Sequence, residues 1–496
     1  MRNMAVIPLW LDEAGWAQIL VKTSLLTPSI RPIGFMALSK LSVSVFGASE
    51  FALRLLPCLA GLATTVLAVP LARQLFRARA AQLLLVASVA FHSTAIDYAK
   101  EFKPYSVSLL LHVACLCLAL RYAKHRERWA LFSGLLLALV GPLFAQDLVF
   151  ALPGLFLALG FAALREPRRF HIASVLLGGA LTFGLLLFMF WFAWRAVDHG
   201  QQAVDYWGGK YDVFYVPGST PSSRLHWLLT KYGDVAALPG DSAALFVETG
   251  SISASVAASM AGVASATWLV LHVLGLALLA YRRRFIELVL LGLPLALCML
   301  FNQLGYWPFG VFRTNLFLVA YACPLAAVAF DSRSGREQAL WPALAAGALV
   351  FAPLLCFERD WHEHKLGLPG MSSFTAVTSA LFNAQGETYD GPAEKLILDA
   401  YSCPVWSYYL NLHPGNDAIV SKARERFVVR CANIHRGALS LALRSARSVP
   451  GPIWIVATSP KEMRDLREVS VKGLHLHELP DKSATVGYFK GRHGRL

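Results

Sequence analysis

The sequence predicts a mainly α-helical membrane protein with many spans, followed by a small α/β domain outside the membrane. Of its 496 residues, 56% are hydrophobic and 15% are charged, and the mean hydropathy is +0.51. A water-soluble core cannot bury that much apolar surface. Many apolar runs approach the roughly 20 residues that cross a bilayer core, and spans in lipid are helices because every backbone polar group needs a partner. After about residue 358 the sequence becomes charged.

Ten apolar runs are bounded by charges or by proline and glycine. The expected spans are 51–72, 80–96, 105–120, 129–145, 148–164, 172–194, 256–280, 285–301, 311–330 and 339–357. Before them, residues 31–47 mix polar with apolar side chains. We expect an interfacial helix there, lying on the bilayer surface, with a distorted span as the alternative.

The formal net charge of +14 is concentrated in short clusters between the apolar runs. Basic residues mark every second connector, at 73–79, 121–128, 165–169, 282–284 and 333–336. This is the positive-inside pattern, so we expect these connectors in the cytoplasm and expect no nucleic-acid partner. The opposite connectors are then extracytoplasmic: the first loop 1–50, then 97–104, 146–147, the long loop 195–255, 302–310 and the tail.

Residues 1–10 are too short to carry the first loop across a membrane. They read like the last turns of a helix and lack the length and cleavage site of a signal peptide. We therefore expect a translation start upstream of Met1, or a fused preceding span.

The tail, 358–496, alternates strand and helix patterns. Candidate strands are Lys395–Asp399, Phe427–Val429 and Pro452–Thr458, and candidate helices are 402–411 and 437–447. This alternation predicts a small α/β domain. Cys403 and Cys431 can form a disulfide if the tail faces an oxidising compartment, although their spacing alone does not fix their separation.

The first candidate site consists of two adjacent acidic residues, Asp12 and Glu13, in an otherwise apolar segment. A helix N-terminus, where acidic side chains are favoured, is the alternative interpretation. A second cluster, 97–105, is dense in charges and tyrosines and includes Glu101, Lys103 and Tyr105. Its alternative is a solvated hairpin with interfacial tyrosines.

A third cluster places Arg313 and Asn315 one turn inside a predicted span. A charge there costs roughly 2.5–3.5 kcal/mol on insertion scales, so Arg313 is expected to have an anionic partner. An arginine that reaches back to the interface is the alternative.

These motifs together resemble a known family. Three motifs follow one another in this order: Asp12-Glu13-Ala14, Ser49 to Pro57, which includes Arg54, and Lys100 to Ser106. Their order and spacing resemble those of bacterial membrane glycosyltransferases related to protein O-mannosyltransferases and to the lipid A aminoarabinose transferase. The stretch from Tyr306 to Asn315 resembles a late-loop motif of that group. The chain departs from it by lacking the usual first span, and by Lys103 where arginine is commoner, which weakens bidentate phosphate recognition.

The resemblance implies a C-type glycosyltransferase bundle over residues 1–357, with the α/β domain at 358–496, in the bacterial inner membrane. It also implies a donor sugar carried on polyprenyl phosphate. By position Asp12 matches the general base, Glu13 its neighbour, and Glu101 and Lys103 the acidic and basic pair of the second loop.

The expected reaction is an inverting single displacement on the extracytoplasmic face, onto a lipid, glycan or protein acceptor. Asp12 takes the proton of the acceptor hydroxyl as that oxygen attacks the anomeric carbon from the face opposite the phosphate. Lys103 and Arg313 bind the donor phosphate. Glu13 or Glu101 orients the acceptor or, with Asp12, holds a divalent metal, which the sequence leaves open. Arg54, Tyr105 and Asn315 are further site candidates.

Two other functions fit a polytopic chain. A transporter or flippase of a glycolipid would line its path with intramembrane charges, but no inverted repeat is detectable and the polar residues gather on one face. A non-catalytic envelope assembly protein would use the tail as its binding module.

Overall fold

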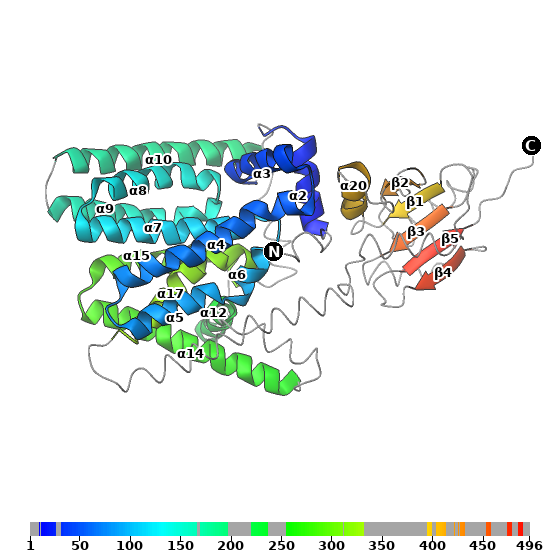
Figure 1. The fold of residues 1–496 in the computed structure, drawn as a ribbon. Coiled ribbons are helices and arrows are strands. Elements are labelled where there is room, and N and C mark those ends of the chain that lie inside the picture. Colours follow the sequence, from blue (N-terminus) through cyan, green and yellow to red (C-terminus); the bar gives the residue numbers. More distant parts are fainter. Residues whose placement is uncertain are drawn as a thin grey trace, which may run out of the picture. The chain divides into compact units, whose positions relative to one another are not determined.

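The computed structural model describes residues 9, 11–25, 31–165, 169–196, 220–236, 254–310, 312–331, 394–398, 403–412, 421, 425, 427–431, 453–457, 474–478 and 485–489. The chain divides into two compact units, whose elements are labelled in Figure 1. Unit 1 comprises Met1–Ser24, Ser39–Leu55 and Glu358–Leu496, and unit 2 comprises Leu25–Leu38 and Leu56–Phe357. The domain boundary expected between 357 and 358 lies outside the described residues.

Unit 2 is helical. Its elements are the greater part of α4 (Glu50–Leu75), then α5 (Arg79–Ala90), α6 (Ser93–Tyr98), α7 (Tyr105–His125), α8 (Arg128–Val140), η1 (Gly141–Leu143), η2 (Gln146–Phe150), α9 (Leu152–Arg165), α10 (Arg169–Ala196), α12 (Pro221–Ala236), α14 (Ala254–Tyr281), α15 (Phe285–Gln303), α16 (Phe312–Asn315), η3 (Leu316–Leu318) and α17 (Val319–Val328). The predicted class, a polytopic helical membrane protein, is confirmed.

Four described helices are long and apolar enough to cross a membrane: α4, α7, α15 and the Arg169–Phe192 part of α10. Shorter apolar helices coincide with five other expected spans. The helix expected within 31–47 is present as α3 (Ile33–Phe46). The tenth expected span, 339–357, and much of the long loop 195–255 lie outside the described residues.

Helices α7 and α10 of unit 2 differ in how much of their surface is buried. The most apolar 18-residue window of α7 is 67% buried, whereas the corresponding window of α10 is 11% buried. The exposed side chains of α10 are large and apolar, among them Leu176, Phe183, Phe188 and Trp191. Such a surface is rare on soluble monomers. We conclude that α10 presents it to the bilayer while α7 is surrounded by other helices.

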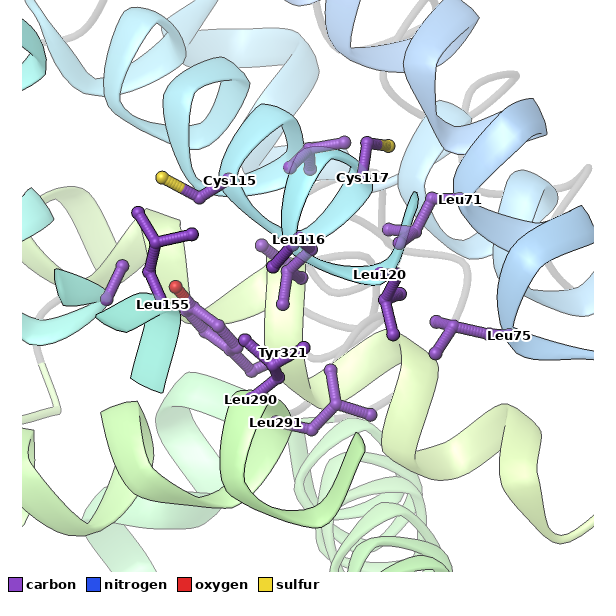
Figure 2. Close-up of a cluster of buried hydrophobic side chains, with 14 of the residues drawn as sticks. Leu71, Leu75, Cys115, Leu116, Cys117, Leu120, Leu155, Leu290, Leu291 and Tyr321 are labelled. Carbon is purple, nitrogen blue, oxygen red and sulfur yellow. The ribbon is translucent and has the colours of Figure 1, made fainter. Parts of the chain in front are cut away.

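Close apolar packing joins the helices around α7. Figure 2 labels part of this cluster: Leu71 and Leu75 of α4, Cys115, Leu116, Cys117 and Leu120 of α7, Leu155 of α9, Leu290 and Leu291 of α15, and Tyr321 of α17. Helices α14 and α17 approach so closely that a Cβ on Gly275 would overlap the carbonyl oxygen of Leu325. Small residues permit such approaches in membranes, where dispersion between packed side chains drives association.

Three tyrosine–histidine hydrogen bonds also connect helices of unit 2. They join Tyr122 of α7 to His171 of α10 at 3.1 Å, Tyr232 of α12 to His272 of α14 at 2.6 Å, and Tyr321 of α17 to His112 of α7 at 2.5 Å. All six side chains are buried. Each pair satisfies polar groups that would otherwise lack partners in the bundle.

Residues of three connectors expected on one side of the membrane, Arg77, Lys124 and Arg284, meet Asp331 and Glu287 at one end of unit 2. Asp331, after α17, accepts the backbone N–H of Arg77 at 2.9 Å and lies 3.3 Å from the guanidinium of Arg284. Glu287 lies 3.2 Å from Arg284 and 4.0 Å from Lys124, which ends α7. The grouping of these connectors therefore agrees with the alternation of charge in the sequence.

Unit 1 contains α2 (Leu11–Lys22), the last part of α3, the first turn of α4, α20 (Cys403–Asn411) and a five-stranded sheet. The strands are β1 (Glu394–Leu398), β2 (Phe427–Cys431), β3 (Ile453–Ala457), β4 (Leu474–Glu478) and β5 (Thr485–Phe489), in the order β2-β1-β3-β5-β4. Strand β1 is parallel to both β2 and β3, whereas β5 is antiparallel to β3 and β4. The predicted α/β domain, three of its strands and the helix at 402–411 are confirmed.

Two strands, β4 and β5, were not predicted. Their sequences, LHLHE and TVGYF, carry polar residues or glycine inside five residues and give a weak strand signal. By contrast all five residues of β3 are buried, as expected of a strand inside a sheet. The helix expected at 437–447 lies outside the described residues.

Cys403, the first residue of α20, is disulfide-bonded. Five other cysteines of the described residues are free, and they lie on α4, α7, α15 and α17. A disulfide at Cys403 is therefore present, while its predicted pairing with Cys431 stays a prediction. Disulfides persist in oxidising compartments.

Candidate functional site

The predicted acidic pair lies in the first turn of α2. Asp12 is half-buried and Glu13 is fully buried, so the two neighbours differ in their access to a substrate. An acidic first turn is favoured by the helix dipole, as the alternative interpretation required. That interpretation does not account for the burial of Glu13, because helix-capping acids are ordinarily solvated.

Glu13 is buried because Arg54 neutralises it. The Arg54 guanidinium donates through Nε to Oε1 at 2.9 Å and through Nη2 to Oε2 at 2.6 Å, a bidentate pair. Arg54 is 3% exposed and Glu13 is 0% exposed. A buried pair with this geometry fixes both groups, since moving either one leaves an uncompensated charge. Arg54 thereby joins the start of α4 to the start of α2, beside Asp12.

Tyr408 and Tyr409 of unit 1 reach the same two helix starts, and no sequence motif marks them. Tyr409 of α20 donates to Glu50 Oε1 at 2.7 Å and accepts the backbone N–H of Leu9 at 3.0 Å. Tyr408 donates to the carbonyl of Ala48. Glu50 belongs to the quoted motif around Arg54, but nothing near Tyr409 resembles a motif. Helix α20 therefore belongs to the surroundings of Asp12.

The second predicted cluster folds into α6 and a turn before α7. Lys103 is 3% exposed, and its neighbour Phe102 stacks on Phe35 with ring centroids 5.5 Å apart. Tyr105 begins α7 and contacts the ring of Tyr98 edge-on at 5.1 Å. A solvated hairpin would expose its lysine, so the burial of Lys103 favours the functional interpretation over that alternative.

Buried Asn315 organises the loop that presents Arg313. The Asn315 side-chain oxygen lies 3.3 Å from Trp307 Nε1, and its nitrogen donates to the carbonyl of Pro308 at 3.0 Å. Gly310 adopts φ +92°, and a Cβ there would meet the side chain of Lys231 at 2.7 Å. The loop accordingly needs glycine at this position. The buried Asn315 side chain therefore holds the loop through its hydrogen bonds, whereas the Arg313 side chain is half-buried.

Arg313 lies close to the second cluster. Helix α16, which carries it, contacts α6. Burial raises the pKa of the Tyr98 hydroxyl, Glu101 raises it further and Arg313 lowers it. Charges on both residues thus act on the same hydroxyl, in agreement with the contact between α16 and α6. Two sequence motifs about 200 residues apart are thus brought together.

The candidates fall into two groups, one in each unit. Asp12, Glu13 and Arg54 belong to unit 1, whereas Glu101, Lys103, Tyr105, Arg313 and Asn315 belong to unit 2. Each group includes one buried cationic side chain, Arg54 or Lys103.

Among the residues that the structure describes, no group of three or more His, Cys, Asp or Glu side chains is placed to hold a metal ion. Both carboxylate oxygens of Glu13 already accept from Arg54. A metal ion bound by Glu13 would have to compete with that guanidinium.

Unit 2 also contains a row of buried polar groups that the sequence did not reveal. Asp147 accepts from the Ser108 hydroxyl at 2.7 Å and lies 3.7 Å from His112 Nε2. His112 also stacks on Phe317, with centroids 4.7 Å apart. Ser108 and His112 stand one turn apart on α7, and two polar residues on one face of an apolar span are the signal that marks such a row.

Residues 30–194 match the model of the family described as dolichyl-phosphate-mannose-protein mannosyltransferase. The crystal structure of ArnT from Cupriavidus metallidurans bound to undecaprenyl phosphate matches with a TM-score of 0.55 at 13% identity, covering 98% of this chain and 95% of ArnT. The apo structure of the same protein matches with a TM-score of 0.53 at 14% identity and the same coverage. The chain has the C-type membrane glycosyltransferase fold. No curated protein matches it in sequence.

The C-type fold agrees with the resemblance carried by the ordered motifs. The family match covers the second loop and α4 to α10, and the structural match extends over the α/β domain as well. Both α20 and the sheet therefore belong to an architecture shared with ArnT.

Proposed function

We propose that this chain is a glycosyltransferase that moves a hexosyl or pentosyl group from a polyprenyl-phosphate donor to an envelope acceptor on the extracytoplasmic face. The observation that carries the proposal is the likeness over 98% of the chain to ArnT, whose structure holds undecaprenyl phosphate. A membrane enzyme with a lipid-phosphate donor needs cations at headgroup depth and a base near the acceptor. The two groups of site residues supply both.

In the proposed reaction the acceptor oxygen forms a bond to the anomeric carbon while the bond from that carbon to the phosphate oxygen breaks. Asp12 takes the hydroxyl proton, and polyprenyl phosphate leaves with the electron pair of the broken bond. Half-buried Asp12 is accessible to an acceptor, whereas Glu13, paired with Arg54, holds the helix start that carries Asp12. Lys103 and Arg313 stabilise the phosphate charge, with Glu101 and Tyr105 beside them.

The deciding experiment is an assay of sugar transfer in membranes containing the purified protein. Radiolabelled sugar on polyprenyl phosphate is the donor, and extracted envelope lipids, glycans and proteins are the acceptors. Formation of free polyprenyl phosphate together with labelled acceptor supports the proposal. Movement of intact donor between leaflets without transfer would instead establish a flippase.

Arg313→Ala is expected to weaken donor use, by about 10- to 100-fold in kcat/KM, because a hydrogen-bonded cation on phosphate contributes about 1.5–3 kcal/mol. Arg313→Lys should retain part of the activity, since the charge remains but the planar fork is lost. The measurement is the initial transfer rate at limiting donor.

The control for Arg313 is Arg121→Ala. Arg121 pairs with Glu127 at 2.7 Å in a partly exposed ion pair, in a connector with basic residues. The Arg121→Ala change removes the same chemical group, a guanidinium, at a position outside the candidate site. Equal donor use by wild type and Arg313→Ala would remove Arg313 from the site.

Orientation is tested by cysteine labelling in intact cells. The disulfide at Cys403 supports an extracytoplasmic α/β domain. A membrane-impermeant maleimide is expected to label Ser421→Cys without permeabilisation, but to label His125→Cys, in a basic connector, only after permeabilisation. The reverse pattern would overturn the proposed orientation together with the extracytoplasmic site.

A further inference from the structure

Helix α20 contacts residues on both sides of the acidic pair: Leu9, just before helix α2, and Gln18 within that helix. Before the pair, the backbone N–H of Leu9 donates to Tyr409 at 3.0 Å. After it, Gln18 Nε2 donates to the carbonyl of Pro404 at 2.5 Å. Asp12 and Glu13 thus lie between two residues that are hydrogen-bonded to the same partner helix, α20.

The same tyrosine also reaches the start of α4. Its hydroxyl donates to Glu50 Oε1 at 2.7 Å, and Glu50 stands one helical turn before Arg54, the partner of Glu13. Burial and the neighbouring Glu50 carboxylate raise the pKa of Tyr409, so its hydroxyl keeps the proton that it donates. A single hydroxyl consequently connects the segment before Asp12 to the helix that neutralises Glu13.

Helix α20 is itself fixed on the α/β domain. Val405, Trp406, Tyr408, Tyr409 and Leu410 are all buried. The Trp406 ring contacts Phe427 of β2 edge-on with centroids 6.3 Å apart, and Cys403 at the start of the helix is disulfide-bonded. The sheet, α20 and the acidic segment therefore form one packed body within unit 1.

We infer that Tyr409 is a positioning residue, through which the C-terminal α/β domain holds Asp12 in its reactive place. The inference rests on the proposed function, because it assigns a role toward the base of that reaction. Tyr409 does not need to contact donor or acceptor, since it acts through Leu9, Glu50 and the Arg54–Glu13 pair. Misplacement of a catalytic group by about 1 Å can cost about 100-fold in rate.

The test uses Tyr409→Phe in the full chain, which keeps the ring and removes both hydrogen bonds of the hydroxyl. We expect single-turnover transfer at saturating donor to fall by about 10- to 100-fold, with donor KM and donor binding unchanged. Gln18→Ala, which removes the other contact with α20, should reproduce this split between rate and KM.

The matched control is Tyr122→Phe. Tyr122 is equally buried and also bonds a side chain of another helix, His171, but it lies in unit 2 away from the candidate residues. The Tyr122→Phe change should lower thermal stability without changing the transfer rate. A Tyr409→Phe variant that transfers as fast as wild type overturns the inference, as does a parallel loss of rate, donor binding and thermal stability.

Amide hydrogen exchange separates this inference from the proposed function. Exchange in residues 9–22 is expected to rise at least about 10-fold in Tyr409→Phe and to stay unchanged in Tyr122→Phe. If the wild type transfers no sugar, the proposed function fails, and exchange still decides whether α20 restrains α2. Unchanged exchange in Tyr409→Phe would remove the restraint and the inference with it.

Discussion

Asp12→Asn is expected to slow the chemical step of sugar transfer by about 10²- to 10⁴-fold. The amide preserves the shape and much of the hydrogen bonding of the carboxylate, but it cannot take the proton of the acceptor hydroxyl. Donor binding should change far less, because the phosphate is assigned to Lys103 and Arg313. The measurement is single-turnover transfer alongside equilibrium binding of the polyprenyl donor.

Glu127→Gln is the control for Asp12→Asn, because it makes the same chemical change in an ion pair with Arg121, in a basic connector. Its transfer rate should equal that of wild type. Transfer by Asp12→Asn at the wild-type rate would refute the assignment of the base. Loss of donor binding in proportion to the rate would make Asp12 a binding residue instead.

Arg54→Ala is expected to destabilise the protein by about 3–5 kcal/mol, the usual cost of removing one partner of a buried ion pair. Glu13 has no exposed surface, so its carboxylate would remain buried without the guanidinium that now donates to both oxygens. The measurement is the unfolding temperature of the purified protein in detergent.

Two comparisons make the Arg54 prediction specific. Arg121→Ala breaks an ion pair whose side chains are 43% and 28% exposed, and such solvent-screened pairs contribute little to stability. Arg54→Met combined with Glu13→Gln removes both charges and should recover much of the stability, because apolar replacement of a buried pair is often neutral. An Arg54→Ala protein that unfolds at the wild-type temperature would contradict the prediction.

The helical class and the strands β1 to β3 could be predicted because they depend on local pattern: long apolar runs, basic connectors and short β-rich segments. The buried clusters could not be predicted in the same way. Arg54 was a site candidate by its motif, but only the structure brings its guanidinium to Glu13, 41 residues away. Burial of Lys103 likewise depends on packing, including Phe35 against Phe102.

Tyr409 marks the limit of sequence reasoning for this chain. Its neighbours Trp406 and Tyr408 read as ordinary apolar positions of a helix, and nothing local connects them with residues 9–13. Long-range hydrogen bonds follow from the tertiary fold and leave no periodic signal. For the same reason the sequence did not reveal the buried contact between Asp147 and His112, although the two polar residues on one face of α7 are a clue.

The hydrogen bond from Leu9 to Tyr409 joins residues 400 positions apart. During synthesis the ribosome must translate nearly the whole chain before the partner of the first described residue exists. Contacts of such high sequence separation form late, because the intervening chain must be ordered first. The acidic segment is therefore made long before its partner on α20 and is among the last parts of the fold to be completed. For the proposed reaction this order means that transfer begins only after the C-terminal domain has folded against the segment that carries Asp12.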